Sequence, residues 1–271
     1  MLPEIDIFGF RLQTFGLMLA LALTSSGVLA ARRLKELGLP VDWVYEIMFC
    51  AGAGGVAGAK LWYVIEKGDL GSLFSGTGLV FYGGAIGGAL AVMAYARYRG
   101  FLDHRLFDMG APGLAIGYAV GRLGCQLAGD GDYGIPSDLP WAMSYPDGTV
   151  PTTDRVHPTP IYEFLVMGAV TWWLWSRRDK ARPGTLIGWW ALLAGIERFL
   201  VEFIRRNDDI AGPFSLAQFV SVVMIVAGSW WLLRARSRAQ SSRTVPSSRS
   251  SAPRKARPAA ASSSRATPTD L

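Results

Sequence analysis

The chain has 271 residues, of which 51% are hydrophobic and ten are tryptophan, and its mean hydropathy is +0.26. The formal net charge of +6 comes from the C-terminal segment, because residues 1–233 carry 18 basic and 20 acidic side chains. This balance gives no signal for nucleic-acid binding over the body of the chain. Two cysteines, both in or beside apolar runs, cannot form a disulfide framework. Repeated apolar stretches of nearly membrane-spanning length instead predict a polytopic membrane protein.

Seven apolar stretches follow one another along the chain. They predict an all-α integral membrane protein with seven transmembrane helices, at residues 12–31, 41–65, 79–96, 106–127, 159–175, 184–204 and 214–233. The second and third stretches contain glycines spaced four residues apart, which favours close helix packing in lipid. No basic region precedes the first stretch and no convincing cleavage site follows it, so we expect no cleaved signal peptide.

The basic residues alternate between connecting segments and predict the orientation. The segments after stretches one, three, five and seven carry 3, 3, 4 and 9 Lys or Arg, and the intervening segments carry one or two. The positive-inside rule then places the N-terminus outside and the C-terminus inside the cell. We expect a membrane domain over residues 1–236, with an acidic outer-face loop at 128–158. Residues 237–271 are too poor in apolar side chains for a core and predict a disordered, basic cytoplasmic tail.

The glycine-rich stretch GRLGCQLAGDGDYG, at residues 121–134, closes the fourth apolar stretch. A charged side chain at membrane depth is costly and usually faces a cavity or a partner. Arg122, with Gly124 and Asp130 beside it, therefore indicates an anion site, which would suit a lipid phosphate. The structural alternative is an arginine whose head reaches the interface beside a glycine-rich turn.

Two further clusters lie at predicted outer helix ends. In HPTPIYE, His157 can act as an acid or base near neutral pH, and Tyr162 and Glu163 follow in the first helical turn. The alternative is a capped helix start in which the helix dipole favours an acidic residue. The third cluster, in ERFLVEFIRR, spaces its charges three and four residues apart along one helix face, with Arg198, Glu202 and Arg205.

The charges that share a helix face in this third cluster could also form a buried structural network.

The third apolar stretch, at residues 79–96, contains Tyr82, Gly83 and Gly84 near its start, and a tyrosine at this position is equally typical of an interfacial aromatic belt. Three charged or polar clusters at the outer ends of different helices nevertheless favour one shared site.

These clusters, in this order, resemble the prolipoprotein diacylglyceryl transferases of bacterial inner membranes, over about residues 8–233. The family signature Gly-Arg-x-Gly-Asn-Phe-x-Asn-x-Glu is matched at Gly121, Arg122 and Gly124, and Asp130 stands at the glutamate position. Cysteine, glutamine and alanine replace the family's Asn, Phe and Asn.

The other two motifs also resemble the family. Its His-Pro-Ser-Gln-Leu-Tyr-Glu is similar to residues 157–163, and its Arg-x-x-x-Glu-Phe-x-Arg is similar to residues 198–205. Two positions depart from the pattern, because Phe15 replaces a tyrosine in the first helix and Tyr82 replaces a histidine at the start of the third. That histidine is a proposed base in the family, so the base in this chain is open between Tyr82 and His157.

The resemblance implies transfer of the diacylglyceryl group of phosphatidylglycerol to the lipobox cysteine thiol of a preprolipoprotein signal peptide, in a multi-pass protein of the bacterial inner membrane and without a metal or other cofactor. It implies catalytic roles for Arg122, Arg198, Tyr82 and His157. Substrate-binding roles are implied for Gly83, Gly84, Gly124, Asp130, Tyr162, Glu163, Glu202 and Arg205. The alternatives are a related enzyme that uses the same lipid with another acceptor, and a non-enzymatic seven-span protein that binds or transports lipid.

Overall fold

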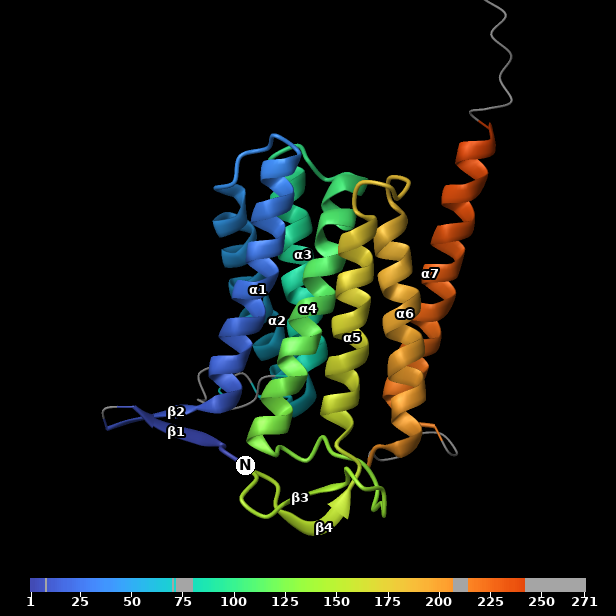
Figure 1. The fold of residues 1–271 in the computed structure, drawn as a ribbon. Coiled ribbons are helices and arrows are strands. Elements are labelled where there is room, and N and C mark those ends of the chain that lie inside the picture. The colour runs from blue at the N-terminus through green and yellow to red at the C-terminus, as the bar shows by residue number, and fades with distance from the viewer. Residues whose placement is uncertain (8, 70, 72–79, 207–213, 242–271) are drawn as a thin grey trace, which may run out of the picture.

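The computed structural model describes residues 1–7, 9–69, 71, 80–206 and 214–241. Helices dominate these residues and run side by side in one bundle (Figure 1). The seven α-helices are α1 (Thr14–Glu36), α2 (Trp43–Lys67), α3 (Phe81–Tyr98), α4 (His104–Ala128), α5 (Thr159–Arg177), α6 (Thr185–Val201) and α7 (Leu216–Ser241). Each helix covers most of one predicted apolar stretch.

Short strands correct the all-α prediction to a mostly helical fold. β1 (Glu4–Ile7) pairs antiparallel with β2 (Phe10–Gln13), and β3 (Met143–Tyr145) pairs antiparallel with β4 (Thr152–Val156). Both pairs lie at the same end of the bundle, which we call the hairpin end (Figure 1). The first helix begins at Thr14 rather than residue 12, because residues 10–13 are paired with β1.

Two further boundaries differ from the predicted ones. The sixth helix ends at Val201, and a 3-10 turn, Glu202–Ile204, continues it with tighter hydrogen bonding. The seventh helix extends to Ser241, into the segment predicted as a tail. Residues 242–271 lie outside the described residues, so the disorder predicted for them stays a prediction.

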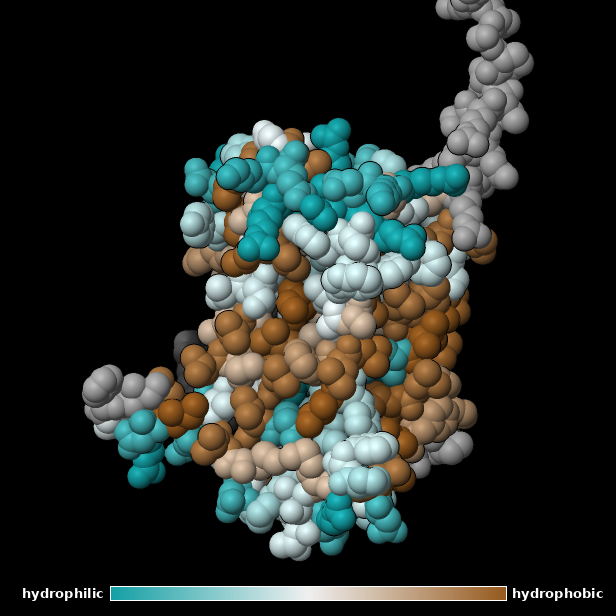
Figure 2. Space-filling view, viewed as in Figure 1, coloured by the Kyte–Doolittle hydropathy of each residue, from teal (hydrophilic) through white to brown (hydrophobic). Residues whose placement is uncertain are grey.

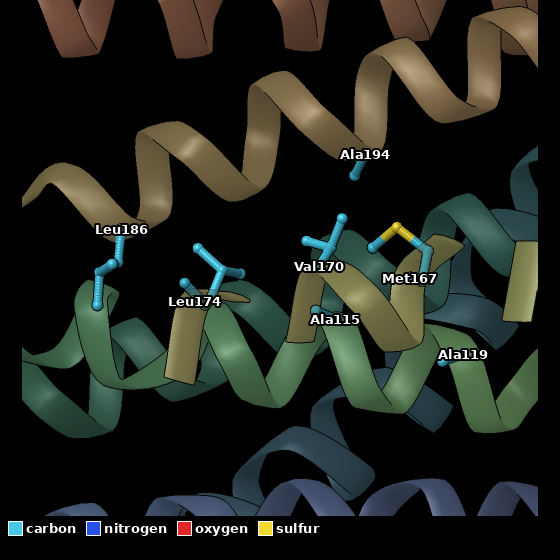
Figure 3. Packing of buried hydrophobic residues seen from close by; sticks show 8 residues of the cluster. Ala115, Ala119, Met167, Val170, Leu174, Leu186 and Ala194 are labelled. Atoms are coloured by element: carbon cyan, nitrogen blue, oxygen red, sulfur yellow. The ribbon is translucent and has the colours of Figure 1, made fainter. Parts of the chain in front are cut away.

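Helix α4 is the central element of the bundle. It packs against α1, α5 and α6, while α2 packs on α3 and α6 on α7. Small side chains on α4 let α5 and α6 approach it, and Met167 and Leu174 of α5 fill the space between them (Figure 3). This core holds the hairpin ends of α4, α5 and α6 together, which is where the charged motifs occur.

Glycines bring α2 and α3 into backbone contact. A Cβ added at Gly58 would lie 2.8 Å from the Gly87 Cα, and one at Gly54 would lie 2.8 Å from the Gly87 carbonyl oxygen. Only residues without a side chain permit this approach. The structure therefore confirms the close packing predicted from the four-residue glycine spacing.

On the face shown in Figure 2, apolar surface lies between two polar ends of the molecule. Among the described residues, three helices are long and apolar enough to cross a membrane by length and composition, namely Thr14–Glu36, Trp43–Lys67 and Leu216–Ala235. The other four helices do not meet this standard; α6, for example, has 17 residues and is too short. The protein is thus a mostly helical membrane protein, and seven complete spans stay a prediction.

Candidate functional site

Six charged side chains meet at the hairpin end of the bundle. We call them the ionic cluster; they are Arg122, Asp132, Glu163, Arg198, Glu202 and Arg205. They come from α4, the loop after α4, α5, α6, the 3-10 turn and the residue directly after that turn. The cluster therefore unites all three charged motifs of the sequence at one place.

Glu163 is the centre of the ionic cluster and has no exposed side-chain surface. Its carboxylate lies 3.2 Å from Arg122 Nε, 3.2 Å from Arg198 Nη1 and 3.5 Å from Arg205 Nη1. The Tyr118 hydroxyl also donates a hydrogen bond of 2.8 Å to it. Helix α5 begins with Thr159 and Pro160, a proline position that helix starts favour, and this start places Glu163 one turn inside the bundle.

Asp132 bridges two arginines from the loop after α4. Its carboxylate oxygens accept hydrogen bonds from Arg122 and Arg205. Helix α4 ends at Gly129 in a left-handed conformation, with φ of +61°, and the chain turns again at Gly131, with φ of +94°. These two positive φ values favour glycine, and they turn the loop back over the helix end.

Backbone contacts hold this loop in place. The Thr159 hydroxyl donates to the Asp132 carbonyl oxygen at 2.5 Å, and the Ile135 amide donates to the Ile204 carbonyl oxygen at 2.8 Å. Burial alone would raise the pKa of Asp132, but the positive charges of Arg205 and Arg122 outweigh burial and lower it. Asp132 is therefore a fixed anion between two fixed cations.

Glu202 links the ionic cluster to the start of α7. It lies 2.8 Å from Arg198 Nη2 and accepts a hydrogen bond of 2.6 Å from the Ser215 hydroxyl. The Gln218 side chain accepts from the Ser215 amide at 3.1 Å and so orders the helix start. Side-chain exposure is 2% for Glu202 and 5% for Arg205, so these groups are largely removed from water.

The three arginines and three carboxylates of the ionic cluster balance in charge. Arg122 and Arg198 keep 17% and 19% of their side-chain surface exposed, and Arg205 keeps 5%. Arg122 also lies over the Tyr118 ring, 4.9 Å from its centroid. The two partly exposed guanidiniums can take up a phosphate oxygen, while their carboxylate partners keep them oriented.

Five residues predicted for the site thus lie in the ionic cluster. Asp130 lies beside it, because its side chain accepts from the Asp132 amide at 3.3 Å. Burial and the nearby charge of Asp132 raise the pKa of Asp130. Gly124 has a packing role, since a Cβ there would lie 3.1 Å from Met18 Cβ and 3.3 Å from the Phe15 ring.

The remaining predicted residues occupy other positions. His157 Nδ1 lies 3.4 Å from the Tyr162 hydroxyl, which accepts a hydrogen bond of 2.7 Å from Trp141 Nε1. These three side chains form an aromatic group between the loop at residues 128–158 and the first turn of α5. Tyr82 and its two glycines begin α3, and Gly84 approaches Ala59 of α2. This start of α3 packs chiefly against α2.

Sequence reasoning missed several contributors. Asp132 stands in the glycine-rich stretch, and Tyr118 precedes Arg122 by one helical turn, which places both on the same face. Glu197, next to Arg198, is 8% exposed, and both of its carboxylate oxygens are buried with no hydrogen-bond partner within ordinary distance among the described residues. A buried carboxylate in this state is rare, so Glu197 belongs among the candidates for a functional role.

One group of side chains has ligand atoms spaced for a metal. One atom each from Cys125, Asp130 and Asp132 lies within 4.8 Å of the others. Both oxygens of Asp132 already accept from arginines, and a metal would have to displace these cations. The group therefore does not argue for a metal centre.

Comparison with known proteins decides the family. A sequence model described as prolipoprotein diacylglyceryl transferase matches residues 4–234. The chain belongs to this family. It is 29% identical to the phosphatidylglycerol–prolipoprotein diacylglyceryl transferase of Clostridium tetani, covering 82% of this chain and 93% of the relative. It is 32% identical to that of Chromohalobacter salexigens, covering 83% and 91%, and 30% identical to that of Pseudomonas fluorescens, covering 90% and 98%.

Family membership also supports the placement of the protein in a membrane. The matched region contains α1 to α6, α7 as far as Arg234, and the whole ionic cluster. Membership thus confirms the resemblance seen in the three sequence motifs.

Proposed function

We propose that the protein transfers the diacylglyceryl group of phosphatidylglycerol to the lipobox cysteine thiol of a preprolipoprotein, at the outer face of the bacterial plasma membrane. The proposal rests on one observation. Arg122 and Arg198 both contact the buried carboxylate of Glu163, each at 3.2 Å. These two arginines belong to different motifs that resemble the family, and both keep some exposed surface. The names of the relatives supply the donor and the acceptor.

The reaction needs a phosphate clamp and a proton acceptor. The thiolate sulfur attacks the terminal glyceryl carbon of the diacylglyceryl group, the C–S bond forms, and the C–O bond to phosphate breaks. Glycerol phosphate leaves with the electron pair, and the thiol proton passes to a base. Arg122 and Arg198 stabilise the negative charge that grows on the leaving phosphate, because fixed donors need no reorganisation during the reaction.

Glu163, Glu202 and Asp132 act as positioning residues in this scheme. Their ion pairs fix the guanidinium planes, so that binding a phosphate costs little further side-chain order. Arg122, Glu163, Arg198, Glu202 and Arg205 stand at positions that resemble the family's motifs, whereas Tyr82 stands where the family pattern has histidine. A phenol has a reference pKa near 10 and is a weak base at neutral pH, so His157 is the second candidate.

A direct test uses the purified protein with phosphatidylglycerol and a lipobox peptide, and measures thioether formation by mass spectrometry. We expect lipidated peptide and released glycerol phosphate in equal amounts. Rescue of a bacterium depleted of its own transferase provides the cellular readout. A folded protein that yields neither product nor rescue, with lipobox peptides of several sequences, would contradict the proposal.

The base is assigned by comparing Tyr82→Phe with His157→Ala in the same assay. Loss of activity in one variant alone assigns the base to that residue. If both variants remain active, neither side chain is required, and the partly exposed guanidiniums of Arg122 and Arg198 favour the ionised thiol. The pH dependence of kcat/KM separates loss of a base from loss of binding.

A further inference from the structure

A cavity of about 450 Å³ lies at the end of the bundle opposite the ionic cluster. It opens between the start of α4, the loop from α5 to α6, and residues 230–235 of α7. Its lining residues are His104, Arg182, Pro183, Gly184, Trp230, Trp231, Arg234 and Ala235. His104 precedes Arg122 by 18 residues of one helix, which separates the two sites by roughly 27 Å.

Charge and aromatic surface are combined in this cavity. Two arginines and a histidine line it together with two tryptophans, and no carboxylate is among the lining residues. The Arg234 guanidinium lies 3.9 Å from the centroid of the Trp230 ring. Arg182 is exposed and, within the part of the chain that the structure describes, forms no ion pair. Such a lining attracts an anion that also carries apolar groups.

The walls of the cavity are built by specific contacts. Trp231 Nε1 donates a hydrogen bond of 2.5 Å to the Gly184 carbonyl oxygen, which ties α7 to the loop before α6. The nearby Asp108 carboxylate accepts from the amides of Gly184 and Leu186, at 2.5 and 2.9 Å. It therefore caps α6 and is already engaged, and the helix end does not itself provide the anion site.

Apolar surface continues from the cavity along α7. Trp230, Val226 and Leu233 expose 49%, 61% and 63% of their surface, on a helix long and apolar enough to cross a membrane. Figure 2 shows apolar surface on the α7 side of the bundle, below the polar end. A ligand with a charged head in the cavity would place its chains against this surface.

We propose that this cavity binds the phosphate headgroup of an anionic membrane phospholipid, with Arg182 and Arg234 on the phosphate and the acyl chains along α7. Basic pockets between membrane helices at the cytoplasmic side are typical sites for such headgroups. Tryptophan at the same depth suits the boundary between headgroup and acyl chain. The site is separate from the proposed reaction, so it stands even if the proposed function fails.

The test measures lipid retention by native mass spectrometry on the purified full chain, titrated with dioleoylphosphatidylglycerol. We expect the double variant Arg182→Gln, Arg234→Gln to retain one lipid fewer than the unmodified protein, with at least tenfold weaker binding of that lipid. The matched control is Arg105→Gln with Lys180→Gln, which removes two charges from the same end outside the cavity lining. This control should retain as many lipids as the unmodified protein.

Further arms identify the ligand and guard against misfolding. Dioleoylphosphatidylcholine should bind equally to all variants, and glycerol 3-phosphate should not displace the retained phosphatidylglycerol. If the double variant does not fold, Arg182→Gln alone gives the test, because this exposed loop side chain forms no described ion pair. Equal retention in all proteins, equal loss in the control, or displacement by glycerol phosphate would each overturn the proposal.

Discussion

At the scale of single residues, the ionic cluster shows why arginine rather than lysine occupies these positions. Arg122 contacts Asp132 and Glu163 with different nitrogens of one guanidinium, and Arg198 contacts Glu163 and Glu202 in the same way. A lysine has one compact charge and cannot span two carboxylates and a phosphate with fixed geometry. The cluster thus uses the planar fork of arginine for position as well as for charge.

Replacing Arg122 by lysine should therefore reduce the transferase reaction while keeping the charge. A lost hydrogen bond to a charged group is worth about 1.5–3 kcal/mol, so we expect kcat/KM to fall roughly 10- to 160-fold. The matched control is Arg155→Lys, because Arg155 donates to loop carbonyl oxygens outside the cluster and should tolerate the change. Full activity in both Arg122→Lys and Arg122→Ala would contradict the phosphate-clamp role.

The lowered pKa of Asp132 predicts that the folded protein loses stability in acid. Because its pKa is lowered in the folded protein, its contribution to stability is fully present above the unfolded value near 3.9 and is lost as the pH falls through the folded value. The Asp132→Asn variant should therefore have a lower thermal midpoint at pH 7. We expect its unfolding free energy to fall by roughly 1–3 kcal/mol, because the ion pairs of Asp132 with Arg122 and Arg205 are only partly exposed.

Measurement of thermal midpoints from pH 7 to pH 3 checks this sign. The difference between Asp132→Asn and the unmodified protein should shrink below about pH 4. Asp138→Asn is the matched control, since Asp138 is an exposed carboxylate of the same loop without a described ion pair. A constant difference over the whole range would mean that Asp132 does not act through its charge.

At the scale of elements, helix positions could be predicted from the sequence better than their ends. Apolar length and composition indicated each helix, because burying or embedding an apolar stretch is a local property. The strands at residues 4–13 were missed, since four-residue strands are stable only through their partner. The 3-10 turn after α6 was also missed, because its hydrogen bonding depends on the loop that pairs with Ile204.

The same limit applies to the candidate site. Spacing along one helix correctly joined Arg198 with Glu202, because residues four apart share a face. The contacts of Glu163 with three arginines require α4, α5 and α6 to pack in one particular way, and no local pattern contains that information. Asp132 was overlooked for the same reason, since its partner Arg205 lies 73 residues away.

The glycine contact between α2 and α3 gives a prediction at this scale. Gly58→Ala would place a methyl group against the Gly83 and Gly87 backbone, and we expect a loss of roughly 1–3 kcal/mol in unfolding free energy. Gly52→Ala is the matched control on the same helix, because a Cβ there has open space around it. The control should be neutral or gain up to about 1 kcal/mol from helix propensity. Equal effects in the two variants would show that the close contact is not needed.

At the scale of the whole molecule, the two ends of the bundle differ in composition. The hairpin end holds the ionic cluster and the acidic loop. The opposite end carries most basic residues, where Arg33 and Arg178 both contact Glu36, at 2.8 and 2.9 Å, and so join α1 to α5. Figure 2 shows polar surface at both ends and apolar surface between them. This asymmetry predicts that the basic end faces the cytoplasm.

Reporter fusions test that orientation and the number of spans together. A fusion after Lys67, at the end of α2, should report the outer compartment, and a fusion after Ser241, at the end of α7, should report the cytoplasm. Five helices separate these two positions, so opposite compartments require an odd number of crossings between them. The same compartment for both fusions would refute the seven-span arrangement. Reversed compartments would place the ionic cluster in the cytoplasm, away from a thiol acceptor that has already crossed the membrane.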